Sequence, residues 1–163
     1  VYTTNDPAPD CRVIDRSPPD EGSWADLSCP GVEEVYLLRQ TDGREAVTYS
    51  HADGSGTPTF GAFNNAGPIV EWRMAQVGSR SVPIAAIQNF TWPMPWQVKH
   101  AILVVSKVGQ PADRAACMMG YVSDHDGAAA NRRARRIADG AATHNCAHDC
   151  PVVEPSAAQV PPR

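Results

Sequence analysis

The sequence predicts an α+β domain, built from a mostly antiparallel sheet that can curl toward a barrel and one C-terminal helix tied to it by a disulfide. Three observations predict this class. The 163 residues suffice for one domain with a real core and are too few for two comfortable ones. Fifteen prolines and twelve glycines require many turns, as in β-rich domains. Short apolar runs recur along the chain, and a helical period occurs near its end.

The two ends of the chain differ in composition from its middle. Residues 1–10 form a polar, proline-bearing arm, and residues 151–163 form a tail with four prolines and no periodicity. Neither segment can bury enough apolar surface to order itself. We therefore expect a single domain over residues 11–150, flanked by two segments that order on a partner surface.

The first half of the domain is expected to consist of short strands and turns. Residues 11–15 (CRVID) are the first strand candidate, and residues 20–30 form a turn-rich return that ends at Cys29. Residues 34–39 and 45–50 flank an Asp-Gly pair, which is a strong hairpin signal. A long loop rich in glycine and proline then extends to residue 68.

Four further strand candidates form an antiparallel meander at the centre of the predicted fold. The first alternates cleanly, with Val70, Trp72 and Met74 on one face. The third, HAILVVSKV, is apolar on both faces and is therefore expected to be a central strand. The four candidates span residues 69–77, 82–91, 100–108 and 115–123.

One helix is expected to follow the last strand. Small or branched apolar side chains recur there at helical spacing and line one face. These residues are Ala130, Ala134, Ile137, Ala138 and Ala141. Asp124 or Asp126 can cap the first turn, so the Asp124-His125-Asp126 triplet is interpreted as a capping segment rather than an acid–base pair or a metal ligand set.

Four arginines crowd the remaining faces of the helix. The basic patch they form is either a solvated surface or a contact for an acidic partner or lipid. Its residues are Arg132, Arg133, Arg135 and Arg136.

Five cysteines in a domain of this size indicate an oxidising compartment. Two bridges and one spare thiol allow about 15 arrangements. We expect Cys11 to pair with Cys29, and Cys117 with Cys146, which leaves Cys150 free. The second bridge would close a loop of about thirty residues, tie the helix to the sheet and contribute about 3 kcal/mol.

A competing interpretation starts from the alternation of His and Cys after the helix. The side chains of His144, Cys146, His148 and Cys150 are the ligand types of a copper or zinc site. Alternation by two, however, spaces neighbouring side chains roughly 6 to 7 Å apart along an extended segment. The stretch contains no glycine to bend it. We favour the disulfide and keep a metal site as the alternative.

The segment TWPMPW, residues 91–96, is the strongest candidate contact surface. Its two prolines reduce the entropy lost on ordering, and tryptophan is enriched at binding hot spots. Phe60 and Phe63, in the preceding long loop, can extend the same patch. The alternative is that these aromatic side chains fold back as a lid over the core. The candidate contact residues are Trp92, Pro93, Met94, Trp96, Phe60 and Phe63.

Charge and motifs narrow the function classes. A net charge of −4 gives no global attraction to nucleic acid, and no stretch reaches the length of a membrane span. Glu71 has no obvious second acid for hydrolysis, and no nucleophile, zinc or phosphate-loop motif occurs. We therefore expect no catalysis and no cofactor. The chain starts at Val1 without a signal-peptide pattern, so we expect a mature exported form whose leader has been removed.

Four motifs occur in an order that resembles a group of small uncharacterised exported proteins of alphaproteobacteria. They are the VEWR strand at Val70, the LVV strand at Leu103, the strand from Cys117 to Tyr121, and the RRIAD helix at Arg135 followed by Cys146. The likeness covers roughly residues 11 to 146. It implies a periplasmic, disulfide-bearing α+β domain with no assigned chemistry. The chain departs from that group in its Trp/Pro/Met loop, in Cys150 and in its long tail.

These observations together predict a non-catalytic accessory or stabilising subunit. We expect it to dock on a larger periplasmic or membrane-attached complex, such as a respiratory, photosynthetic or dehydrogenase assembly, through its two arms and the loop at residues 92–96. One alternative is a free periplasmic inhibitor of a lytic enzyme. Another is a His/Cys metal-binding protein.

Overall fold

The computed structural model describes residues 1–4, 10–33, 35–41, 43–50, 60, 63–92, 100–112 and 115–154, with the backbone alone at 35–41 and 100. One group of strands comprises β1 (Tyr2–Thr4), β6 (Asn65–Val77), β7 (Arg80–Trp92), β8 (His100–Lys107), β9 (Cys117–Ser123) and β10 (Val152–Val153). These form sheet A in the order β1-β6-β7-β8-β9-β10. The other group comprises β2 (Arg12–Arg16), β3 (Trp24–Pro30), β4 (Val35–Thr41) and β5 (Arg44–Thr48). These form sheet B in chain order.

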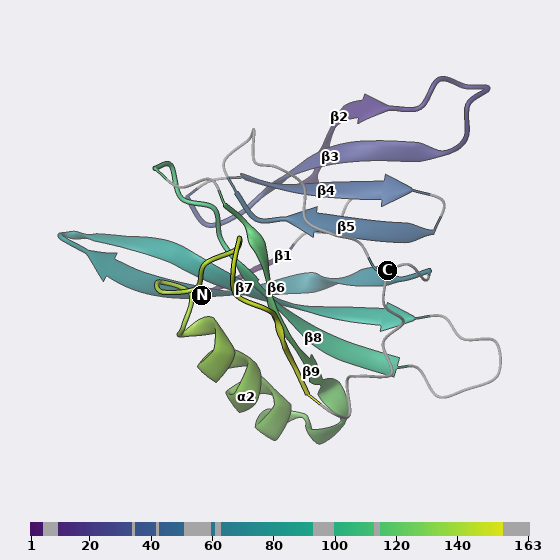
Figure 1. Ribbon diagram of the computed structural model, residues 1–163. Coiled ribbons are helices and arrows are strands. Elements are labelled where there is room, and N and C mark those ends of the chain that lie inside the picture. The colour runs from purple at the N-terminus through teal and green to yellow at the C-terminus, as the bar shows by residue number, and fades with distance from the viewer. Residues whose placement is uncertain are drawn as a thin grey trace.

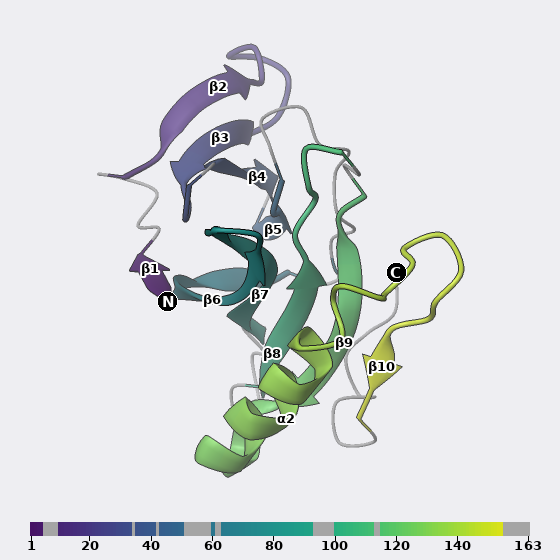
Figure 2. The ribbon, with the colours of Figure 1, turned by 90° about the vertical axis from the view of Figure 1, so that its left-hand side faces the viewer.

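Sheet A is the middle of three layers. Sheet B lies on one side of it, and helix α2 (Ala128–Ala138) lies on the other (Figures 1 and 2). Side chains that alternate along a strand point to opposite faces. On β8, Ile102 and Val104 accordingly face the core beneath sheet B, whereas Leu103 and Val105 face the helix. The prediction that this strand is central is confirmed.

The predicted meander is also confirmed, because β6, β7, β8 and β9 pair antiparallel in succession. The sheet as a whole is mixed, since β10 pairs parallel with β9. The expected α+β class with a C-terminal helix therefore holds. The curl toward a closed barrel does not occur: within the described residues, sheet A ends at β1 and β10.

Two strands are longer than the sequence predicted. The segment expected to be a turn-rich return contains β3, whose Leu27 and Cys29 are buried against sheet A. Strand β6 begins at Asn65, inside the predicted loop, because its first residues pair with the end of β7. The predicted hairpin between β4 and β5 is present. Thr41 pairs with Arg44, and Gly43 has a φ of 78°, a conformation that glycine adopts without strain.

Both predicted arms contribute an edge strand to sheet A. Tyr2–Thr4 pairs antiparallel with β6, and the indole Nε1 of Trp72 donates to Thr3 Oγ1 at 2.7 Å. Val152–Val153 pairs with β9, and Glu154 N donates to Tyr121 O at 3.2 Å. These residues therefore order on the domain itself, and not on a partner surface as expected. The rest of the arms, residues 5–9 and 155–163, lies outside the described residues.

The start of the helix corrects the predicted cap. Asp124–Asp126 forms a 3-10 turn, and Gly127, with a φ of 51°, is the N-cap residue of α2 without any side-chain capping bond. Asp124 instead accepts a hydrogen bond from Asn89 Nδ2 at 2.7 Å. The predicted apolar face is confirmed. Ile137 packs beside four alanines that are buried against sheet A. These are Ala130, Ala134, Ala138 and Ala141.

Gly120 gives the sharpest test of this packing. A Cβ atom at this position would lie 2.7 Å from Val152 O and 3.2 Å from the Ile137 side chain. The backbone oxygen cannot move without displacing β10. We expect Gly120→Ala to destabilise the chain by roughly 1 to 3 kcal/mol in urea unfolding. In a chain that ends at Pro151 the cost should fall, because the oxygen is absent. An equal cost in both chains would contradict this account.

Candidate docking surface

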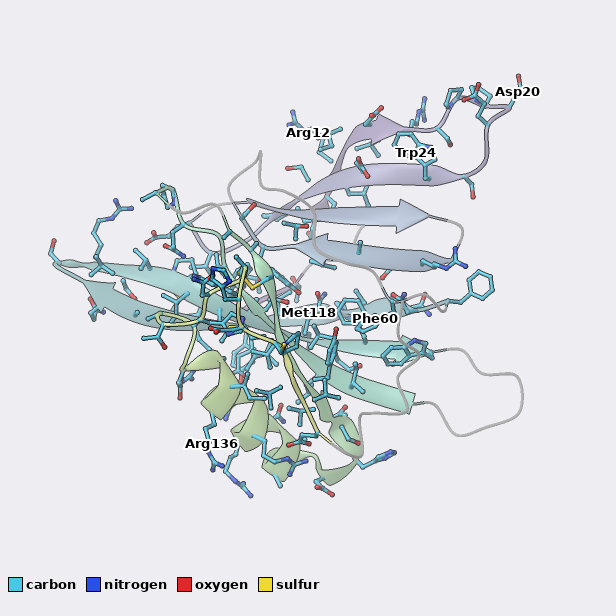
Figure 3. The ribbon with its side chains drawn as sticks, in the orientation of Figure 1. Arg12, Asp20, Trp24, Phe60, Met118 and Arg136 are labelled. Carbon is cyan, nitrogen blue, oxygen red and sulfur yellow. A yellow bond between two sulfur atoms is a disulfide. The ribbon has the colours of Figure 1, made fainter. Side chains whose placement is uncertain are left out.

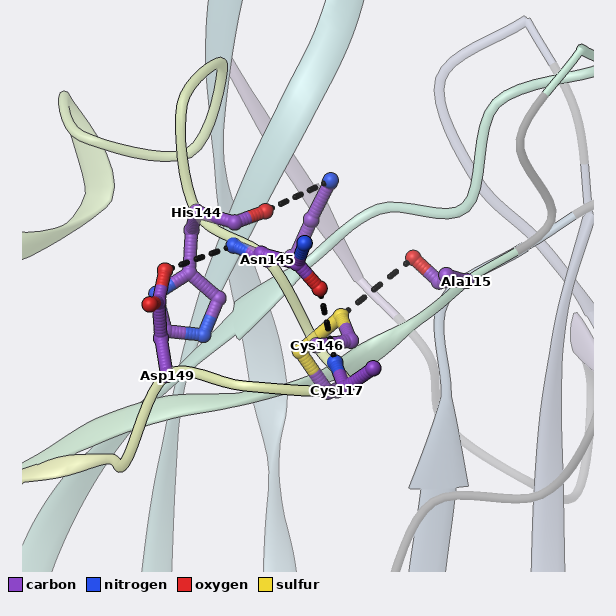
Figure 4. Close-up of a disulfide and its surroundings, with 8 residues drawn as sticks. Ala115, Cys117, His144, Asn145, Cys146 and Asp149 are labelled. Atoms are coloured by element: carbon purple, nitrogen blue, oxygen red, sulfur yellow. Dashed lines mark hydrogen bonds and ion pairs between the residues drawn. A yellow bond between two sulfur atoms is a disulfide. The ribbon is translucent and has the colours of Figure 1, made fainter.

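The two predicted disulfides are present. Cys11 is bonded to Cys29 and Cys117 to Cys146, over sequence separations of 18 and 29 residues, and Cys150 is free and exposed. The second bridge joins the first residue of β9 to the turn after α2 (Figure 4). The two disulfides indicate an oxidising compartment.

The stretch from His144 to Cys150 forms a turn rather than an extended segment. Asp149 N donates to Asn145 O at 2.8 Å, and Asn145 N donates to Asp149 Oδ2 at 2.7 Å. His144, 12% exposed, places its Nδ1 3.7 Å from Asp149 Oδ2, as Figure 4 shows. His148 and Cys150 are exposed.

Because the sulfur of Cys146 is bonded to Cys117 in a disulfide, the alternative His/Cys metal site loses one of its four ligands. In the part of the chain that the structure describes, no group of three or more His, Cys, Asp or Glu side chains could hold a metal ion. Ala115 O lies 3.6 Å from Cys146 Sγ, a contact without a hydrogen bond because a disulfide sulfur carries no proton.

The disulfides can be tested one at a time. In the chain-entropy account, Cys117→Ala with Cys146→Ala should lose about 3 to 4 kcal/mol in guanidinium unfolding, and the Cys11/Cys29 pair about 3 kcal/mol. Cys150→Ser should change stability by less than about 0.5 kcal/mol, because the side chain is exposed. Alkylation of the native oxidised protein, followed by mass spectrometry, should label Cys150 alone. Labelling of Cys146 would refute the pairing.

The predicted basic patch divides into two parts. Arg133 donates to Glu154 Oε1 at 2.6 Å and lies 3.2 Å from Asp126 Oδ2, which fixes the start of the C-terminal tail against the helix. Arg135 points to the sheet. Arg132 and Arg136 are exposed, and Figure 3 shows Arg136 pointing away from the body of the protein. Contact with an acidic partner stays a prediction for these two.

Glu71, the isolated carboxylate of the sequence, joins three elements. Its oxygens accept bonds from Arg135 Nε at 2.6 Å and Nη2 at 2.9 Å, and from Tyr2 OH at 3.0 Å. Burial by itself would raise the pKa of Glu71. The hydrogen bonds from Arg135 and Tyr2, with the charges of Arg135 and Arg73, outweigh burial and hold this pKa below its ordinary value. Glu71 therefore ties β1, β6 and α2 together as an ionised group.

This carboxylate makes stability depend on pH. Its contribution is complete above the unfolded-state pKa of about 4.3, and it is lost as the pH falls through the lower folded-state pKa. We expect Glu71→Gln to cost on the order of 1 to 2 kcal/mol at pH 7 and much less at acid pH. Urea unfolding across this range measures the difference. Glu21→Gln, at an exposed turn residue, is the matched control. A Glu71→Gln deficit that stays constant at acid pH would contradict the assignment.

The candidate contact aromatics separate into buried and exposed side chains. Trp92 is 4% and Phe60 5% exposed, and their rings meet edge to face with centroids 5.0 Å apart. Phe60 lies between the two sheets (Figure 3). The contact interpretation is wrong for these two residues, and the lid alternative holds for them. Pro93, Met94 and Trp96 lie outside the described residues.

Among the candidate contact residues that the structure describes, Phe63 has an exposed aromatic side chain, at 56%. The buried Asn64 beside it fixes its position, because Asn64 N donates to Gly43 O at 3.0 Å and its side-chain oxygen accepts from Glu45 N at 3.2 Å. A Cβ atom on Gly43 would lie 3.0 Å from the Phe63 ring, so the ring packs against the turn at a residue that has no side chain. The Arg44 guanidinium lies 5.2 Å from the ring centroid. Phe63 is thus held outward by rigid neighbours.

Gly43 and Arg44, which contact this ring, also line a groove of about 520 Å³. We call it the hairpin-end groove, since it is formed by the β2–β3 connection, the β4–β5 turn and the start of β6. Its larger side chains are an aromatic residue, two arginines, two prolines and a glutamate: Trp24, Arg16, Arg44, Pro18, Pro19 and Glu45. Tryptophan and arginine are the residue types most enriched at interface hot spots.

The wall of the hairpin-end groove is preorganised. Glu21 N donates to Pro18 O at 3.1 Å, which closes a tight turn. The Ser17 hydroxyl donates to Gly22 O at 3.0 Å and accepts from Trp24 N at 3.3 Å. A rigid wall loses little entropy when a partner binds. This groove was not predicted from the sequence. The available signal was the Pro-Pro-Asp-Glu-Gly-Ser segment, residues 18–23, directly before Trp24.

Comparison of the chain with protein-family models, with curated proteins and with solved structures finds no match. Among the described residues no helix has the length and apolar character needed to cross a membrane.

Proposed function

We propose that this chain is a non-catalytic accessory subunit, exported to the periplasm, that docks on a larger periplasmic or membrane-attached complex. A respiratory, photosynthetic or dehydrogenase assembly suits that compartment. The observation that carries the proposal is the hairpin-end groove, whose lining residues Gly43 and Arg44 also contact the exposed Phe63 ring. The disulfides support an exported location, and so does the resemblance to small exported alphaproteobacterial proteins.

Two further features support docking at this end of the molecule. Pairing of Asn65 with Thr91 brings Phe63 beside the end of β7, from which residues 93–99 continue. In the sequence, the candidate contact residues Pro93, Met94 and Trp96 directly follow this end of β7, and they lie outside the described residues. In addition, Glu71 and Asp124, which the sequence offered for chemistry, are engaged in structural hydrogen bonds. The exposed contact area at the hairpin end favours a binding function over catalysis. So does the engagement of both carboxylates in structural hydrogen bonds.

The variant that tests this proposal must leave the buried core and the sheet intact. Because Trp92 is buried and β10 belongs to the sheet, the variant to use carries Phe63→Ala and Trp96→Ala and ends at Glu154. The tagged wild-type chain, isolated from the cells that make it under gentle conditions, should elute with a defined high-mass assembly. The variant should retain its fold and lose at least about tenfold in co-elution, as expected for hot-spot side chains.

Val77→Ala is the matched control. Val77 is 62% exposed but lies at the opposite end of β6, so co-elution should be unchanged. Undiminished binding by the triple variant would overturn docking at the hairpin end. A wild-type chain that elutes as a monomer and inhibits a lytic hydrolase would support the inhibitor alternative instead.

A further inference from the structure

A second concavity lies at the other end of the molecule, where the two sheets separate. We call it the inter-sheet cleft. It has a volume of about 260 Å³, and five separate segments of the chain line it. Its floor is buried and mainly apolar, with Trp72, Pro83, Val108 and Gly109, and Val82 lines its side.

The polar groups that line the cleft include the buried Ser50 and several donors that the protein itself satisfies. Val108 N donates to Ile84 O at 3.0 Å, and Gly109 N donates to Tyr49 O at 2.9 Å. The Gln110 amide nitrogen is shared between Pro83 O at 2.8 Å and Val108 O at 3.1 Å. These donors are already satisfied by the protein. A ligand that enters the cleft must therefore present an apolar group to the floor.

The mouth of the inter-sheet cleft carries one charge of each sign. Glu33, from the connection after β3, and Arg80, at the start of β7, lie 3.6 Å apart, with side chains 44% and 76% exposed. Glu33 has a φ of 64°, a left-handed conformation that costs a non-glycine residue about 1 to 2 kcal/mol. Such backbone outliers cluster at functional sites. The strained conformation places a carboxylate opposite the guanidinium at the edge of an apolar floor.

From this combination we propose that the inter-sheet cleft binds a free α-amino acid with an apolar side chain. The side chain enters over Trp72 and Pro83, the carboxylate of the ligand meets Arg80, and its ammonium group meets Glu33. The two charges at the mouth, which pair with each other across 3.6 Å when the cleft is empty, have the signs needed to bind a zwitterion in place of this exposed mutual contact. The volume agrees: an apolar cavity of about 150 Å³ holds benzene, while pockets for drug-sized ligands start at about 300 Å³. The site lies away from the hairpin-end groove and does not depend on the docking proposal.

The proposal is tested with four small probes and the full oxidised chain. L-phenylalanine should bind at 1:1 stoichiometry with a dissociation constant of about 1 mM or tighter in calorimetry. 3-Phenylpropanoate lacks the ammonium group, phenethylamine lacks the carboxylate, and glycine lacks the apolar body. The first two should bind roughly threefold to tenfold more weakly, because each loses one exposed charge contact. Glycine should not bind measurably.

Two variants assign each charge to its partner. Arg80→Gln should weaken phenylalanine and 3-phenylpropanoate but leave phenethylamine unchanged. Glu33→Gln should weaken phenylalanine and phenethylamine but leave 3-phenylpropanoate unchanged. Val82→Trp, which fills the cleft from its side, should abolish binding. Arg136→Gln, an exposed arginine on α2, is the control and should leave every affinity unchanged.

The outcomes that overturn the proposal are specific. One is the absence of saturable binding up to about 20 mM phenylalanine. Another is equal affinity for the probes that lack one charge. A third is retention of binding by a folded Val82→Trp chain. If Val82→Trp does not fold, the crossed pattern of the two surface variants decides, and its absence rejects the site.

Discussion

Sheet A has apolar side chains on both faces, and the rest of the structure follows from the need to cover them. Sheet B covers one face, and a buried polar contact joins the layers: Tyr49 OH donates to Gln88 Oε1, while Gln88 Nε2 donates to Gly67 O at 2.6 Å. Helix α2 covers the other face with alanines small enough for close approach. Since an unsatisfied buried amide is costly, Gln88 also selects one arrangement of the two sheets.

Covering sheet A also determines what the charged residues do. The helix can lie flat only if the ionised groups between it and β6 are paired, and Arg135 meets Glu71 there. At the far edge Arg133 meets Glu154, which holds the start of the tail. The surface chemistry is consequently left to Arg132 and Arg136 and to the ends of the sheets. Some arginines of this run thus have a structural role. The periodicity of the sequence alone does not show which arginines these are.

The parts of the fold that the sequence could predict depend on local periodicity. Strand β8, apolar on both faces, and the alanine face of α2 are visible in any window of ten residues. The pairing of Cys117 with Cys146 followed from placing one cysteine on a strand and the other just past the helix. Pairings between distant segments carry no such signal. The polar Tyr2–Thr4 and the tail Val152–Val153 became edge strands because β6 and β9 offered free edges, which neither segment encodes. The predicted strand ends at residue 91, one residue before the end of β7. Trp92 continues the alternation of Phe90 and is therefore buried in the same core rather than exposed as a contact residue.

The candidate sites lie toward the two ends of the β6–β7 hairpin, one at the start of β6 and the other at the start of β7. The pairing of β6 with β7 shifts register between Ala66 and Val70, and again between Arg73 and Met74. Such bulges bend a strand and increase its twist. The middle of β6, with Val70, Glu71 and Trp72, is buried, while the residues at both ends of the strand are exposed. Where the layers separate, side chains no longer fill the space between them, and a concavity forms. The hairpin-end groove is lined by Asn65 at the start of β6, whereas the inter-sheet cleft is lined by Trp72 in its buried middle and by the start of β7, which pairs with the end of β6.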